Sequence, residues 1–286
     1  MTRHGNAAGL ALPELMVALT ISLVLILAST TLMMLTRSAY LLVDDRSRME
    51  ESGRFAVDAI GRAVRQAGFR EWSVAGIADA AWPAVAGLDA QSLRDAADGM
   101  DPPYGATVNG SDVLALRFDG SAADGGAGLQ HCAGAVVPAD VSGAGWSIFY
   151  VANDSGGEPE LRCKYRGVSG WNSDALVRGV DSFQVLYGLE GSDDAAPLRY
   201  VTAAALEREG SAWQRVAAVR FALLLHGVQP GSERASRYDL FGADYADDAD
   251  FGARLVESQF PAASRGLLRR VYRATVYLRN RSRGAL

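Results

Sequence analysis

The sequence predicts an α+β protein in which a long N-terminal helix precedes an antiparallel β-rich domain. Three observations predict this class. Residues 15–36 carry no charge, and residues 37–68 keep a helical pattern with charges of alternating sign. The rest of the chain consists of short β-type runs separated by glycine- and aspartate-rich turns. No helix–strand alternation follows, which favours an antiparallel sheet over a parallel one.

The composition sets outer limits on the class of protein. The chain has 286 residues, of which 49% are apolar and 21% charged, so it can bury a core and is not expected to be disordered. Its net charge of −5 argues against nucleic acid as the main partner, because phosphate binding needs a basic face.

The uncharged run "LMVALTISLVLILASTTLMMLT" is long enough to cross a membrane as a helix. At 1.5 Å per residue it measures about 33 Å. A secretory signal peptide is a weaker interpretation, since the apolar character resumes after Ala28 and Ser29 and no convincing cleavage site appears. An uncleaved membrane anchor remains an alternative.

Pro13 and Glu14 stand at the head of this run. Glu14 could lie at the membrane interface and favour the helix N-terminus through the macrodipole. A cleavage after Gly9 would instead place a new amine on Leu10, one helical turn from the Glu14 carboxylate. The same cleavage would remove the upstream carbonyl with which Pro13 would clash in a continuous helix. One event would therefore explain both residues.

The second half of the predicted helix, residues 37–68, is amphipathic. Gly53 and Gly61 interrupt its pattern, and Gly68 is a plausible terminator. An apolar stripe is expected at Ala56, Ile60, Ala63, Val64 and Ala67, and a solvated charged face at Glu50, Arg54, Asp58 and Arg62. Beyond Gly68, strands are expected at residues 111–118, 146–151, 161–165, 182–188, 216–226 and 272–278.

Several quoted stretches resemble one family. "GLALPELMVAL" resembles the class III signal of type IV prepilins, with Leu10 where that family usually has phenylalanine. "RMEESGRFAVDAIGRAVRQAGF" resembles the PilW-like minor pilins. Three later stretches resemble the same proteins: "LVRGVDSFQVLYG", "WQRVAAVRFALLL" and "RRVYRATVYLRNRS".

The resemblance implies a pilin-like fold and a division of the chain. Residues 1–9 would be a leader, 10–36 a transmembrane and filament-core helix, 37–68 its amphipathic continuation, and 69–286 the globular domain. Prepilin peptidase would cut between Gly9 and Leu10, and Leu10 would be N-methylated. Glu14 would be the assembly residue, which neutralises a subunit's N-terminal amine in the apolar filament core.

The resemblance also implies a function without enzyme activity or cofactor. The chain would be a minor pilin that primes or caps a type IV pilus. Its partners would be other minor pilins, the major pilin, prepilin peptidase and the inner-membrane assembly platform. It would sit in the inner membrane, with its globular domain in the periplasm, before incorporation. The alternatives are a J-type pseudopilin of a type II secretion system and an uncleaved membrane-anchored periplasmic binding protein.

Cys132 and Cys163 are the two cysteines of the chain. Outside the cytoplasm a disulfide between them is expected, and two buried free thiols are the alternative. His4, His131 and His226 form no ligand-spaced cluster with them, which argues against zinc.

No catalytic motif appears in the sequence. Next to Cys132, His131 is poorly placed for a catalytic pair, because adjacent residues of a strand point to opposite faces. We expect His226 to be an edge residue at the end of its strand, and Trp171 and Trp213 to pack in the core. The acidic stretch 242–252 offers calcium ligands at Asp244, Asp247, Asp248 and Asp250, but it lacks EF-hand spacing, and a solvated loop is the simpler interpretation.

Overall fold

A computed structural model describes residues 12–70, 83–95, 97–121, 128–138, 145–167, 169–190, 198–231, 237–245, 250 and 252–280. The chain divides into two compact units, Met1–Ser47 and Arg48–Leu286. Helix α1 (Leu12–Gln66) contributes residues to both units.

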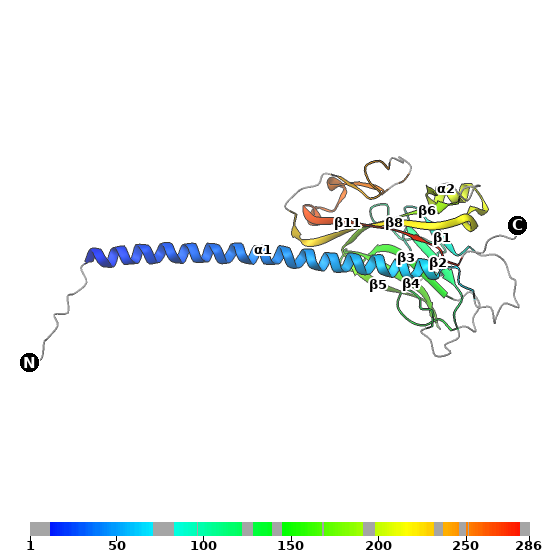
Figure 1. Cartoon of the computed structure of the whole chain (residues 1–286), viewed down its shortest axis with the longest axis horizontal. Coiled ribbons are helices and arrows are strands. Elements are labelled where there is room, and N and C mark those ends of the chain that lie inside the picture. Colours follow the sequence, from blue (N-terminus) through cyan, green and yellow to red (C-terminus); the bar gives the residue numbers. More distant parts are fainter. Residues whose placement is uncertain are drawn as a thin grey trace, which may run out of the picture. The chain divides into compact units, whose positions relative to one another are not determined.

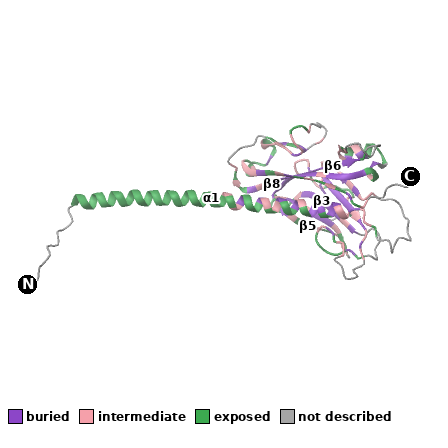
Figure 2. Cartoon of the chain, viewed as in Figure 1, coloured by how far each residue is buried: buried purple, intermediate pink, exposed green. Residues whose placement is uncertain are grey.

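In the first unit, residues 12–47 are helical throughout, and residues 12–41 are exposed. Among the described residues, α1 is the one helix long and apolar enough to cross a membrane. The exposed helix is coloured green in Figure 2. The predicted long helix is confirmed, and it ends where Gly68 adopts a positive φ of 76°.

The second unit contains two large antiparallel sheets and a smaller two-stranded one (Figure 1). The five-stranded sheet has the order β1-β2-β3-β4-β5, and the four-stranded sheet has the order β11-β8-β6-β7. The first comprises β1 (Val85–Leu88), β2 (Val113–Phe118), β3 (Gly145–Asn153), β4 (Pro159–Gly167) and β5 (Gly170–Arg178). The second comprises β6 (Val180–Leu189), β7 (Arg199–Val201), β8 (Val216–Pro230) and β11 (Leu267–Tyr277).

Smaller elements complete the second unit. Strands β9 (Arg237–Asp239) and β10 (Arg254–Val256) pair with each other, and α2 (Ala203–Arg208) is a short helix. The 3-10 turns are η1 (Ser211–Arg215), η2 (Glu257–Gln259) and η3 (Ala262–Ser264).

The main core lies between the C-terminal part of α1 and the two sheets (Figure 2). The predicted stripe is buried as expected, with Ile60 and Val64 fully inaccessible to solvent. The sheets contribute, among others, Leu116, Phe149, Leu161, Phe183, Phe221 and Leu223. The helical period of the stripe therefore reflects real burial on one face.

A second apolar layer covers the other face of the four-stranded sheet. Ala222 and Leu224 of β8 pack there against Leu240, Leu255 and Phe260. The residues that cover this face all belong to the segment 237–266, which contains β9, β10, η2 and η3. This segment therefore gives the sheet a partner on its second side.

Each of the six predicted strands overlaps an observed strand, although β2 begins only at Val113 and β11 ends at Tyr277, and every strand pairing in the described chain is antiparallel. The sequence reading missed β5, whose residues are mostly exposed and polar, and β1, which lies in a stretch rich in alanine and glycine. One expectation was wrong: β8 continues to Pro230, so His226 does not end its strand. It lies opposite Arg269 of β11, and its amide donates to the carbonyl of Gly179, the residue before β6, at 2.9 Å.

Candidate functional site

The apolar part of α1 satisfies five of its hydroxyl groups internally. Each of these five donates to a carbonyl three or four residues earlier, at 2.8–2.9 Å, in the pairs Thr20–Val17, Ser22–Ala18, Thr30–Leu27, Thr31–Leu27 and Thr36–Leu32. In an apolar layer an unsatisfied polar group costs several kcal/mol, of order ~4–8 on a hydrocarbon scale. These hydroxyls are thus compatible with an apolar environment around the helix.

Pro13 and Glu14 lie in the first turn of α1, which begins at Leu12. The missing amide hydrogen of Pro13 costs nothing there, because first-turn amides have no helical acceptor. Together with Val17, Ala18 and Ile21 they line an open hollow of about 430 Å³ on the helix surface. The carboxylate is therefore on an apolar face of the helix. Gly9 and Leu10, and with them the expected cleavage and methylation, lie outside the described residues.

In the second unit, α1 approaches β11 most closely at Gly53. A Cβ atom added to Gly53 would lie 2.4 Å from Cζ of Tyr272, closer than real contacts allow. The Tyr272 hydroxyl donates to the Met49 carbonyl at 3.0 Å and lies 3.3 Å from a Glu50 oxygen. Burial, together with the charge of Glu50, raises the pKa of Tyr272 to about 12. The phenol is therefore a donor that fixes the helix to the strand.

Glu50 connects the same two elements by charge. Its carboxylate lies 3.0 Å from Nε of Arg54 on the helix and 2.6 Å from a guanidinium nitrogen of Arg270 on β11. The hydrogen bond from Arg54 is the main reason why the pKa of Glu50 is lowered. Because these groups are exposed to solvent, which screens their charges, the contribution of these pairs to stability is small.

The end of α1 is held by Asn280. Its Nδ2 lies 3.3–3.4 Å from the last carbonyls of the helix, those of Arg65, Gln66 and Ala67. A Cβ atom on Gly68 would lie 2.2 Å from the backbone oxygen of Asn280. Glycine is therefore required at position 68 both for its positive φ and for this close approach.

The contacts between the C-terminal part of α1 and the stretch 272–280 recur at similar distances along both elements. Gly53, Gly61 and Gly68 face Tyr272, Val276 and Asn280 in turn. Eight helical residues rise about 12 Å and seven about 10.5 Å, while four extended residues rise about 13 Å. Two stretches that carried the family resemblance, far apart in the sequence, thus meet at one interface. Sequence reasoning missed this pairing, although the matched spacings were a usable signal.

This interface makes a paired prediction. We expect Gly53→Ala to lower the free energy of unfolding by about 2 kcal/mol, because the Tyr272 ring must move. Gly61→Ala gains the same helix propensity but meets Arg65 only at 3.4 Å and Val276 at 3.7 Å, so it should be neutral or stabilising by up to about 1 kcal/mol. Thermal unfolding of the full chain in detergent measures both. Equal melting temperatures for the two variants would contradict the proposed contact.

The predicted disulfide between Cys132 and Cys163 is confirmed, with Cα atoms 5.9 Å apart. It joins the segment 128–138 to β4. The Cys132 amide donates to Ser147 Oγ at 3.0 Å, and the His131 ring stacks on Tyr165 with centroids 4.0 Å apart. Burial lowers the pKa of His131.

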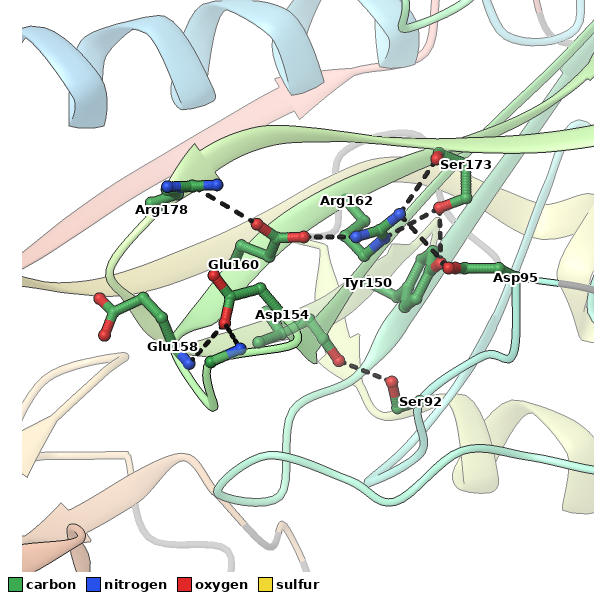
Figure 3. A network of polar contacts seen from close by, with 11 residues as sticks. Ser92, Asp95, Tyr150, Asp154, Glu158, Glu160, Arg162, Ser173 and Arg178 are labelled. Atoms are coloured by element: carbon green, nitrogen blue, oxygen red, sulfur yellow. Dashed lines mark hydrogen bonds and ion pairs between the residues drawn. The ribbon is translucent and has the colours of Figure 1, made fainter.

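A polar network lies on β3, β4 and β5 (Figure 3). The buried Glu160 carboxylate accepts from Arg162 and lies 3.8 Å from Arg178. Arg162 also donates to Ser173, and the Tyr150 hydroxyl donates to Asp95 at 2.7 Å. Each charged group that Figure 3 places around Arg162 has an opposite charge or a polar partner, which favours a structural role over a catalytic one.

Lys164 of β4 is the chain's single lysine and is fully buried. Its ammonium donates to the Arg94 carbonyl at 2.7 Å. Burial lowers its pKa, against the opposing charges of Asp95 and other acidic residues. The lysine therefore ties the segment before Asp95 to the sheet.

His226 lies between two carboxylates. Its Nδ1 is 3.1 Å from Asp181 and its Nε2 is 3.0 Å from Glu158. Only the doubly protonated ring has a hydrogen on both nitrogens. Burial alone would lower the pKa of His226, but Asp181 and Glu158 outweigh burial and the nearby Arg269, so the pKa is raised above 6.5. His226 thus connects the β3–β4 turn to the four-stranded sheet.

This environment predicts a pH dependence. Because the folded pKa of His226 is raised, its contribution to stability is complete below pH 6.5 and is lost as the pH rises through the folded value. We expect the difference in melting temperature between the wild type and His226→Gln to be largest near pH 6 and to narrow toward pH 9. A difference that stays constant across this range would exclude a charged His226.

The acidic stretch does not form a metal site within the described residues. Asp247 and Asp248 lie outside them, and Asp250 accepts a hydrogen bond from the Tyr245 hydroxyl at 2.7 Å. Across the described chain, no group of three or more His, Cys, Asp or Glu side chains could hold a metal ion. Asp244 is likewise in no such group.

Trp171 and Trp213 are half-buried against the core, as expected. Trp171 meets Trp146 edge-on with ring centroids 5.8 Å apart, and Trp213 meets Tyr187 in the same way at 4.9 Å.

These features define a class of protein. A long N-terminal helix, apolar at first and then amphipathic, is followed by an antiparallel β domain, which is a pilin-like α+β architecture. Residues 148–280 match the model of the PilW family, described as type IV pilus-assembly protein W. This part of the chain, slightly less than half of it, is therefore similar to the PilW pilus-assembly proteins.

Two further comparisons were made. The chain is similar to the solved structure of a type IV-like pilin, TTHA1219 from Thermus thermophilus, with 18% sequence identity, 85% of this chain and 98% of that chain covered, and a TM-score of 0.39. No curated protein matches the chain.

Proposed function

We propose that the chain is a minor pilin that primes or caps a type IV pilus. The observation that carries this proposal is the combination of an exposed apolar helix headed by Pro13 and Glu14 with a C-terminal domain that matches the PilW family. The two features come from different parts of the chain, so they support the proposal independently. In this function α1 inserts among the helices of other pilins, and the β domain lies at the end of the fibre.

Glu14 is the proposed assembly residue. A carboxylate in an apolar layer requires a positive partner, and the N-terminal amine of a subunit cut after Gly9 would supply one. The partners are other minor pilins, the major pilin, prepilin peptidase and the assembly platform. The proposed orientation places the β domain in the periplasm, where the Cys132–Cys163 disulfide would persist.

The first test is the N-terminal mass of the protein recovered from membranes of cells with and without prepilin peptidase. We expect a methylated chain that begins at Leu10 in the first case, and a chain that retains residues 1–9 in the second. Retention of residues 1–9 in cells that contain the peptidase would refute the proposal and favour an uncleaved anchor.

The J-type pseudopilin predicts the same processing. Fractionation separates the two functions, because a minor pilin should be recovered with sheared pili, whereas a pseudopilin should depend on secretion components. Recovery with pili is the expected result.

A further inference from the structure

The described residues of the segment 237–266 pack on only part of the second face of the four-stranded sheet. Beyond that cover lies a set of residues that we name the arginine face: Tyr200 of β7, Arg220 of β8, Thr275 and Tyr277 of β11, and, at its border, Phe241 and Arg273. The strand register places these strand residues on one side of the sheet, since Arg220 is opposite Thr275 and Ala222 is opposite Arg273. Tyr277 is 62% exposed.

The two arginines of this face are diagonal neighbours across β8 and β11. Diagonal positions of an antiparallel pair are about 7–8 Å apart, which is within reach of long side chains such as arginine. Arg220 and Arg273 also line one groove of about 360 Å³ together with Phe241 and Thr275. Two positive charges therefore point to one concave surface.

The partners of both guanidinium groups are uncharged in the described part of the chain. Arg220 lies 4.0 Å above the Tyr200 ring and donates to Thr275 Oγ1 at 3.3 Å. Arg273 donates to the backbone oxygens of Asp239, at 2.5 Å, and Leu240.

The side chain of Asp239 is already occupied. Its carboxylate accepts from Arg237 at 2.8 Å and from Arg254 at 2.9 Å. Other exposed arginines also have acidic partners: Arg199 lies 2.7 Å from Glu209. Within the described part of the chain, Arg220 and Arg273 therefore lack the kind of acidic partner that Arg199 has.

We infer that the arginine face binds an acidic segment of a partner protein, with a carboxylate between Arg220 and Arg273 and an apolar side chain against Phe241 and Tyr277. Arginine is suited to such binding because its planar group can bond a carboxylate through two nitrogens. Arginine and aromatic residues are also the types enriched where proteins bind each other. This inference stands on the geometry of the sheet face and does not depend on the proposed function.

The first test asks whether Arg220 lacks a negatively charged partner, and it uses substitutions in the chain itself. Thr275→Glu places a carboxylate directly opposite Arg220, and Thr275→Gln is the matched uncharged control. We expect the Glu variant to melt a few degrees, about 2–4 °C, above the Gln variant at low salt, and the difference to disappear near 1 M NaCl. A Glu variant no more stable than the Gln variant at low salt would overturn the inference.

Binding is tested with the full chain in detergent and two dye-labelled peptides, one alternating glutamate with phenylalanine and the other alternating lysine with phenylalanine. The acidic peptide should bind and the basic peptide should not. Arg220→Gln and Thr275→Glu should each weaken binding at least tenfold, whereas Arg199→Gln, whose arginine is already paired with Glu209, should not.

Three outcomes would overturn the assignment. They are equal binding of the two peptides, binding that is insensitive to Arg220→Gln, and binding of inorganic phosphate or an oligothymidylate in preference to the acidic peptide. The last result would assign the face to a phosphate ligand. Because the Arg220 side chain stacks on Tyr200 and donates to Thr275 but has no acidic partner in the described chain, its substitution should leave folding intact, which the melting temperature checks.

Discussion

Glu14→Val should reach the membrane and be cut normally, yet should enter pili at no more than a tenth of the wild-type level. Removing one partner of a buried charge pair costs about 3–5 kcal/mol, because the other charge is left alone in an apolar layer. Here the charge left alone would be the N-terminal amine of a subunit. The measurement is the ratio of this protein in sheared pili to that in membranes, by immunoblot.

The control for this prediction is Thr20→Val. It also removes a polar group from the apolar run, but the Thr20 hydroxyl is satisfied within the helix by the Val17 carbonyl. Its substitution should therefore leave the ratio unchanged. Normal incorporation of Glu14→Val, or an equal loss for Thr20→Val, would refute the ion-pair role of Glu14.

Loss of the Cys132–Cys163 disulfide has the largest expected effect on stability. The bridge closes a loop with a sequence separation of 31 residues. In the chain-entropy model, a loop of this size stabilises the folded state by about 3–4 kcal/mol. For a domain of this size, that corresponds to a melting temperature lower by about 10 °C.

The variant to compare is the double substitution Cys132→Ser and Cys163→Ser. We expect its melting temperature to match that of the reduced wild type, and a reductant to have no effect on it. The segment 128–138 should then be the first to become accessible to protease, because the bridge joins it to β4. A reductant that leaves the wild-type melting temperature unchanged would show that the bridge adds no stability.

Much of the fold could be predicted from local patterns. The uncharged run and the stripe from Ala56 to Ala67 indicate a helix because its period is a property of consecutive residues. Strands β2, β3, β6 and β8 were found because they are rich in β-branched and aromatic residues. Strand β5 was not found, because it is an exposed edge strand and its sequence does not alternate between apolar and polar residues.

Residues of the candidate site could be predicted only where the signal comes from their immediate neighbours in the sequence. Pro13 and Glu14 are conspicuous against an apolar background, and two cysteines leave one possible intramolecular pairing. His226 was misplaced because β8 continues beyond it along β11, which pairs with β8 as far as Pro230, whereas β6 pairs with β8 only as far as Leu225. Its raised pKa depends on Asp181 and Glu158, which lie in other elements.

The sequence by itself determined the class of this protein: a membrane-length helix headed by a proline and a glutamate, an amphipathic continuation and an antiparallel domain. The tertiary structure decided how the parts fit. Only the strand register places Arg220 diagonally from Arg273, and only the packing of α1 on β11 explains Gly53 through Tyr272. The physical reason is that helix and strand periods repeat over a few residues, whereas register and close packing join residues that may be separated by most of the chain.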